Sequence, residues 1–267
     1  MTDRVLTLDG MYAGYDNVAV VRDLSLHVDR GEVVALLGPN GAGKTTTLGA
    51  ISGIVRLHEG SIDILGHAVP KLRSAYLVAQ WGVVHVPEKR GLFFQLTVEE
   101  NLKLAPRLEA GNTDEAYELF PALKPLRNRM AGTMSGGEQQ MLALARGLLA
   151  QPDLLMVDEM SLGLAPVIYE ELMPMVRDVA DRTNTGVLLV EQHTDLALEQ
   201  ADRAYVLSHG DLVLEGNAAD LLKDRHLIDE AYLGAEALED DPAVAAFEAG
   251  EKPGSPSAQE PPEATDG

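Results

Sequence analysis

Short apolar runs alternate with longer mixed stretches along most of the chain, and the two patterns predict different elements. Runs rich in Val, Ile and Leu predict β-strands at residues 6–8, 18–28, 33–37, 62–65, 83–86, 154–157 and 187–190. Turns are expected at residues 29–31 and 58–60, where glycine follows charged residues. The last three runs are almost wholly apolar, which is typical of central parallel strands covered on both faces.

The stretches between these runs fit helices at residues 44–54, 136–150, 166–182 and 194–201. From about residue 89 to 134 the strand pattern disappears, and short helical pieces are expected at 98–110 and 113–120. The early strands suggest an antiparallel layer and the later ones a doubly wound core. We therefore predict an α/β fold with an antiparallel β layer, a parallel α/β core and an inserted α-helical subdomain at about residues 89–140.

Composition changes after residue 235. Residues 236–267 contain nine acidic residues and one basic residue, together with five prolines and a single aromatic residue, Phe247. Such a segment buries too little apolar surface to offset the entropy of ordering. We expect a disordered, acidic, proline-rich tail after a domain that spans residues 1–235; the alternative is an acidic peptide that binds a partner.

The charge balance excludes some functions. The chain has 267 residues, 21 basic against 42 acidic, for a net charge of −21, and no cysteine. This acid excess opposes binding to nucleic acid, which requires a clustered basic field, and the missing cysteines exclude disulfides and thiolate metal sites. The sequence begins without a secretory signal, and no apolar run approaches the roughly 18 residues of a membrane-spanning helix. We expect a cytoplasmic protein.

The strongest local signal lies between the strand at 33–37 and the helix that follows it. A glycine, four free positions and then Gly-Lys-Thr form a phosphate-binding loop, in which glycines allow close backbone approach and successive N–H groups bind an anion at a helix N-terminus. The lysine is placed for the β- and γ-phosphates and the threonine hydroxyl for Mg²⁺. The alternative is a glycine-rich turn with a surface lysine. The loop comprises Gly38, Pro39, Asn40, Gly41, Ala42, Gly43, Lys44, Thr45 and Thr46.

Two carboxylates follow the buried strand at 154–157. Asp158 stands at its carboxyl end, where ligands of open α/β sheets bind, and Glu159 comes next. Asp158 is the candidate ligand for Mg²⁺, through water, and Glu159 is the candidate general base that polarises an attacking water. Taken without the phosphate loop, the pair would be two solvated acids at a strand end.

A second helix N-terminus suited to anions lies in the segment 134–140, which ends 14 residues before that strand. It is formed by Ser135, Gly136, Gly137 and Glu138, which precede an amphipathic helix. Serine and glycine at this position are also ordinary helix-capping residues. Because one nucleotide can scarcely use two such termini, the pattern suggests that two chains share each nucleotide.

The order of these motifs resembles the ATP-binding cassette (ABC) family of ATPases over about residues 4–234. In that family residues 38–46 correspond to Walker A, 154–159 to Walker B and 135–139 to the signature. The resemblance implies ATP and Mg²⁺ as cofactors. It also implies a head-to-tail dimer, in which the signature of each cassette closes over the ATP bound by the other.

Two further residues gain a role from this resemblance. His193, in the switch-histidine position, would contact the γ-phosphate and keep Glu159 and the water in register, although a lone histidine at a strand end is usually structural. Tyr15 corresponds to the aromatic residue on which adenine stacks, although it could be a packed residue of the β layer.

Three positions depart from the family pattern. Glu88 stands where the family usually has a metal-sensing Gln; a carboxylate can still accept from metal-bound water, so Glu88 joins the candidate metal residues. Met160 replaces the common Pro after Walker B, and Ala165 replaces the D-loop Asp of many members.

The segments 86–90, 96–102, 134–142 and 161–166 resemble one branch, the shorter ATPase subunit of branched-chain amino-acid importers, called LivF. This likeness implies transmembrane permease subunits as partners, a second ABC ATPase subunit in a homo- or heterodimer, and indirectly an extracytoplasmic solute-binding protein. The chain would then lie at the inner face of the cell membrane, held by its permeases. Alternatives are the ATPase of a urea or amide importer or of lipopolysaccharide export, or a soluble cofactor-assembly ATPase.

Overall fold

The computed structural model describes residues 3–71, 74–105 and 112–239, and its strands form two sheets. A four-stranded sheet has the order β2-β1-β4-β5, and a six-stranded sheet has the order β10-β9-β3-β8-β7-β6. The strands are β1 (Arg4–Tyr15), β2 (Val18–Asp29), β3 (Val33–Leu37), β4 (Arg56–Ile64), β5 (His67–Ala68), β6 (Val83–Val86), β7 (Leu154–Asp158), β8 (Gly186–Glu191), β9 (Arg203–Ser208) and β10 (Asp211–Asn217).

Helices cover the six-stranded sheet and fill the connections. They are α1 (Lys44–Ile51), α2 (Ala75–Gln80), α3 (Val98–Lys103), α4 (Asp114–Leu119), α5 (Gly136–Leu149), α6 (Pro166–Thr183), α7 (Thr194–Gln200), α8 (Ala218–Lys223) and α9 (His226–Glu239), with short 3₁₀ turns at Pro121–Leu126 and Ala131–Thr133. Within the described residues, no helix combines the length and the apolar character needed to cross a membrane.

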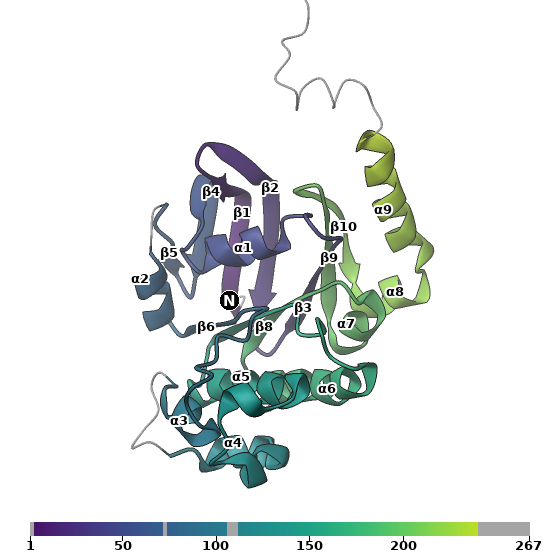
Figure 1. Ribbon diagram of the computed structural model, residues 1–267. Helices are drawn as coiled ribbons and strands as arrows, with labels where there is room; N and C mark the ends of the chain where they lie inside the picture. The colour runs from purple at the N-terminus through teal and green to yellow at the C-terminus, as the bar shows by residue number, and fades with distance from the viewer. Residues whose placement is uncertain (1–2, 72–73, 106–111, 240–267) are drawn as a thin grey trace, which may run out of the picture.

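The six-stranded sheet is the middle layer of the molecule. Along β3 the side chains alternate: Val34 and Leu36 pack with the antiparallel sheet and α1, whereas Val33, Ala35 and Leu37 pack with the helices. Figure 1 shows α5 and α6 together on the helical side and β1, β2 and β4 on the other. Both faces of the central strands are therefore buried, which confirms the parallel core predicted from their apolar runs.

Two expectations about the early strands are wrong. β3 does not belong to the antiparallel layer with β1, β2 and β4 but is the third strand of the six-stranded sheet, parallel to β8 and β9. The turn expected at 58–60 lies inside β4, where the pairing with β1 shifts register. Gly60 has φ 74°, and a Cβ there would meet the Gly10 carbonyl oxygen at 2.1 Å, so the glycine serves a close strand approach.

The C-terminal part of the fold extends beyond the predicted elements. β9 and β10 form an antiparallel hairpin at the edge of the six-stranded sheet, and neither was among the expected strands. α9 continues to Glu239, so residues 236–239, expected to be disordered, are helical. The rest of the expected acidic tail, 240–267, lies outside the described residues.

Helical pieces occupy the stretch between β6 and α5, as the loss of the strand pattern predicts. α3 ends at Lys103, earlier than expected, and residues 106–111 lie outside the described part. Glu99 of α3 ties these pieces together, because its carboxylate accepts hydrogen bonds from Thr113 (3.0 Å), Tyr117 (2.8 Å) and Arg127 (2.8 Å). Burial alone would raise the pKa of Glu99, but these bonds lower it to about 2.

Glu99→Gln should destabilise the chain by about 2 kcal/mol, because it removes a buried charge that three donors satisfy. Since the pKa is lowered, the stabilisation is present above the ordinary value of 4.5 and is lost as the pH falls toward 2. Urea unfolding at pH 7 and pH 4 measures both effects. Glu118→Gln, at an exposed position of α4, is the control; equal midpoints for the two variants at pH 7 would refute the role of Glu99.

Candidate functional site

The carboxyl ends of three parallel strands meet at one edge of the six-stranded sheet. In the registers of β3, β8 and β7, Leu37 lies opposite Glu191, and Asp158 lies opposite Val190. The loop after β3, the acidic pair after β7 and the residues after β8 therefore converge, although they come from distant parts of the sequence. This edge is where open parallel sheets bind their ligands.

The loop between β3 and α1 has the backbone of a phosphate-binding loop. Gly38, Gly41 and Gly43 have φ of 154°, 83° and 100°, values that other residues rarely adopt. A Cβ on Gly38 would lie 2.4 Å from the Leu207 carbonyl oxygen, and one on Gly43 would lie 2.8 Å from Val21. The glycines thus permit both the turn and its close packing, and α1 begins directly after them.

Lys44 begins α1 and is almost fully buried, at 3% exposure. Its Nζ donates to the carbonyl oxygens of Gly38 (2.8 Å) and Pro39 (2.9 Å) and lies 3.3 Å from a carboxylate oxygen of Glu159. The loop encloses a cavity of about 250 Å³. It is lined by Val20, Asn40, Gly41, Gly43, Lys44, Thr45, Thr46, Glu88 and Glu159. The structure therefore gathers the predicted phosphate loop, Glu88 and Glu159 around one cavity.

Asp158 and Thr45 provide a place for a divalent cation. Asp158 is 3% exposed, and its Oδ1 has no hydrogen-bond partner in the described part of the chain. Burial, and then the carboxylates of Glu159 and Glu88, raise its pKa to about 6, whereas the Thr45 hydroxyl and Lys44 oppose that rise. An orphaned carboxylate oxygen beside a hydroxyl suits Mg²⁺. The described residues contain no cluster of three His, Cys, Asp or Glu that could hold a metal.

Glu159 is held from three sides. Its backbone has φ 44°, and its N–H donates to the Val190 carbonyl at 2.9 Å. One carboxylate oxygen faces Lys44, and the other accepts a 2.9 Å hydrogen bond from Gln192. His193, the residue after Gln192, is exposed at the start of α7. Its ring centroid lies 6.1 Å from that of Tyr169. A base positioned this way, next to a phosphate loop, can polarise a water that attacks a phosphoryl group.

The other predicted nucleotide-contacting residues lie outside this cavity. Ser135 and Glu138 form a capping box at the start of α5, with hydrogen bonds of 2.7 and 3.3 Å, and Ser135 is exposed. Gly137 packs on α6, where a Cβ would lie 2.6 Å from Ile168. Tyr15, 56% exposed at the end of β1, is not among the residues that line the cavity. Within one chain, the second anion-suited terminus is therefore not part of the cavity of the phosphate loop.

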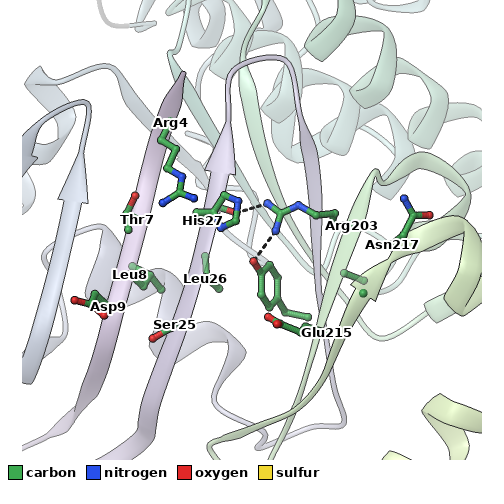
Figure 2. A pocket seen from close by; sticks show the side chains of 13 residues that line it. Arg4, Thr7, Leu8, Asp9, Ser25, Leu26, His27, Arg203, Glu215 and Asn217 are labelled. Atoms are coloured by element: carbon green, nitrogen blue, oxygen red, sulfur yellow. Dashed lines mark hydrogen bonds between the residues drawn. The ribbon is translucent and has the colours of Figure 1, made fainter. Parts of the chain in front are cut away.

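A larger hollow of about 680 Å³ lies between β1 and β2 of one sheet and β9 and β10 of the other (Figure 2). Its central cation, Arg203, is already satisfied: it donates to Glu32 (2.6 Å), to the Tyr205 hydroxyl (2.7 Å) and to the His27 carbonyl (2.9 Å). Because these bonds occupy its guanidinium, Arg203 joins the two sheets. The smaller cavity at the strand ends is therefore the better candidate for a catalytic site.

Comparisons with known proteins agree with this geometry. The ABC transporter family model matches residues 21–161. The ATP-binding protein BraG of Pseudomonas aeruginosa, from high-affinity branched-chain amino acid transport, is 41% identical over 86% of this chain and 100% of its own length. The chain belongs to the ABC transporter family. This result confirms the family resemblance and identifies the chain as an ATPase cassette.

Other relatives of this ABC cassette differ in role. LivF of Archaeoglobus fulgidus, a probable branched-chain amino acid transport protein, is 35% identical over 79% of this chain and 91% of its own length. LptB of Haemophilus influenzae, from lipopolysaccharide export, is 32% identical over 86% of this chain and 97% of its own. The ADP conformation of MJ1267, an ABC cassette, superposes on this chain with a TM-score of 0.73 at 24% sequence identity. The superposition covers 86% of this chain and 99% of MJ1267, and it supports the predicted α/β fold.

Sequence reasoning gave no role to two contacts of this ABC site. Gln192 bridges Asn40 (2.7 Å) and Glu159, and Ser161 donates through N–H and hydroxyl to the buried carboxylate of Glu191. In the sequence, Glu191 and Gln192 are visible only as two polar residues at the end of a buried strand. Tertiary structure determines which residues they contact.

Lys44→Ala should weaken ATP binding at least tenfold, because it removes the cation that faces the phosphates. Titration with a fluorescent ATP analogue measures the loss. Lys223→Ala, which breaks an exposed 3.0 Å ion pair with Asp220, should bind like the wild type. Equal affinities for wild type and Lys44→Ala would remove this loop as the nucleotide site.

Proposed function

We propose that this cassette hydrolyses ATP to drive an ABC importer of branched-chain amino acids. The observation that carries the proposal is the cavity at the strand ends, which the phosphate loop, Glu88 and an oriented Glu159 line together. The buried Asp158, with its orphaned carboxylate oxygen, lies beside Thr45 of that loop. Identity to BraG over all of that protein's length supports the cargo class. The lower identity to LptB makes lipopolysaccharide export the second candidate.

Each residue of the site has a separate role in binding or hydrolysing ATP. Lys44 and the backbone N–H groups of residues 38–46 bind the phosphates. Thr45 and Asp158 would hold Mg²⁺, which would supply positive charge to offset that of the phosphate oxygens, and Glu88 would accept a hydrogen bond from water at the ion. Glu159 acts as general base, and His193 keeps it in register with the γ-phosphate. The exposed ring of Tyr15 stacks on adenine.

A second cassette completes each site. The helix N-terminus at Ser135, Gly136, Gly137 and Glu138 begins with an exposed serine, and none of the four residues lines the cavity of the phosphate loop, so we assign it to ATP bound by the partner cassette. Arg90 donates to Gln139 (2.9 Å) and Gln140 (3.2 Å), and thereby connects the Glu88 loop to this helix. Closure of the dimer and the state of the Glu88 loop are thus mechanically linked.

The permeases dock beside that loop, over the groove between the helical pieces and the six-stranded sheet. The groove is lined by Val84, Phe93, Leu104 and Arg146 among others, and Phe93 and Leu104 are half exposed. Docking there places the chain at the inner face of the membrane, with an extracytoplasmic binding protein delivering cargo to the permeases.

Glu159→Gln should retain ATP affinity while hydrolysis falls at least 100-fold, because the amide cannot accept the proton of the attacking water. Phosphate release and fluorescent-nucleotide binding, measured side by side, test this. A dimer trapped by ATP in size-exclusion chromatography is also expected. Hydrolysis within twofold of the wild type would show that another group is the base.

Deletion of the gene should reduce uptake of radiolabelled leucine, isoleucine and valine, and the wild-type gene, but not its Glu159→Gln form, should restore it. Urea uptake and outer-membrane lipopolysaccharide, measured in the same strains, separate the alternatives. Normal leucine uptake with a lipopolysaccharide defect would refute the cargo and leave the ATPase assignment intact.

A further inference from the structure

Gln192 lies directly after β8 and connects two parts of the site that are far apart in sequence. Its Nε2 donates to Asn40 Oδ1 of the phosphate loop (2.7 Å) and to Glu159 Oε2 (2.9 Å). An amide nitrogen has two N–H groups, so this arrangement uses both and sets the orientation of the side chain. Gln192 is therefore fixed at one end by the loop that binds phosphate and presents its other N–H to the base.

The backbone that leads into Gln192 is buried and hydrogen bonded. β8 lies between β3 and β7, and all of its residues are buried. The preceding residue, Glu191, is 0% exposed and accepts from both the N–H (3.1 Å) and the hydroxyl (2.6 Å) of Ser161. A side chain that directly follows such a strand is positioned more precisely than one on a surface loop.

The second partner of the Glu159 carboxylate is Lys44, 3.3 Å away. Lys44 also serves the phosphates, and an anion in the loop draws its ammonium group toward itself. Gln192 is neutral, so phosphate does not compete for it to the same degree. It is the donor that continues to orient Glu159 once nucleotide is bound.

We propose that Gln192 is a positioning residue for ATP hydrolysis, which holds the Glu159 carboxylate against the cavity through an amide that Asn40 fixes in place. The inference rests on the proposed role of Glu159 as general base. Gln192 does not line the cavity, so it acts through Glu159. Loss of this donor lets the carboxylate rotate, and a misplacement of about 1 Å costs on the order of 100-fold in rate.

The test is steady-state ATP hydrolysis by the full-length chain carrying Gln192→Ala or Gln192→Glu. For Gln192→Ala we expect kcat to fall roughly 10- to 100-fold, with KM for ATP within about threefold of the wild type. Gln192→Glu should lose at least as much, because its carboxylate would face the carboxylate of Glu159. The control is Gln80→Ala, which should keep full activity. It removes an amide group that donates a hydrogen bond to the Tyr76 hydroxyl on helix α2.

A double variant separates positioning from a structural role. In single-turnover assays with radiolabelled ATP, Gln192→Ala should add no further loss to Glu159→Gln, because the group it positions is already gone. The inference is overturned if Gln192→Ala keeps kcat within twofold, if its losses add fully to those of Glu159→Gln, or if its kcat falls only in step with a lower melting temperature. Full activity of Glu159→Gln itself would instead overturn the proposed base.

Discussion

The site depends on the parallel register of β3, β8 and β7. These strands are apolar and buried along their length, and polar side chains occur where they end. The pairs Leu37–Glu191 and Asp158–Val190 bring the three ends level. Because side chains alternate between faces with a period of two, a slip by one residue would turn Asp158 away from the phosphate loop. Burial of both sheet faces penalises such a slip, so the packing of the core also maintains the geometry of the site.

The local charge of the site contrasts with that of the whole chain. A net charge of −21 would repel a polyphosphate; Glu159 and Glu88 add carboxylates at the binding cavity itself, and Asp158 adds another next to them. Binding therefore depends on Lys44, on backbone N–H groups and on a divalent cation at Asp158. The raised pKa of Asp158 expresses the same imbalance, since burial and neighbouring carboxylates penalise its charged form. A cation at this point would offset that penalty while it neutralises phosphate.

Local patterns predicted the central strands, the phosphate loop and the carboxylates after β7, because each is contiguous in sequence. They failed where tertiary contacts decide. β10 alternates half-buried and exposed residues and includes Gly216, so it lacks the apolar run that marks a buried strand. Gly60 resembles a turn residue, but it serves the close approach of β4 to Gly10. The contact between Gln192 and Asn40 joins positions 152 residues apart and follows from the β3–β8 pairing, which no local pattern expresses.

The conformation of Glu159 is the clearest case of structure maintained by its neighbours. A glutamate at φ 44° lies in the left-handed region, which costs on the order of 1–2 kcal/mol for a residue with a Cβ. Its N–H bonds Val190, and two residues later Ser161 is tied twice to Glu191, so β8 fixes the chain on both sides of Met160. Met160 is itself buried, at 1% exposure, where the family commonly has proline. Because buried methionine and these hydrogen bonds constrain the loop together, the strained turn does not require a proline, and the base keeps its direction into the cavity.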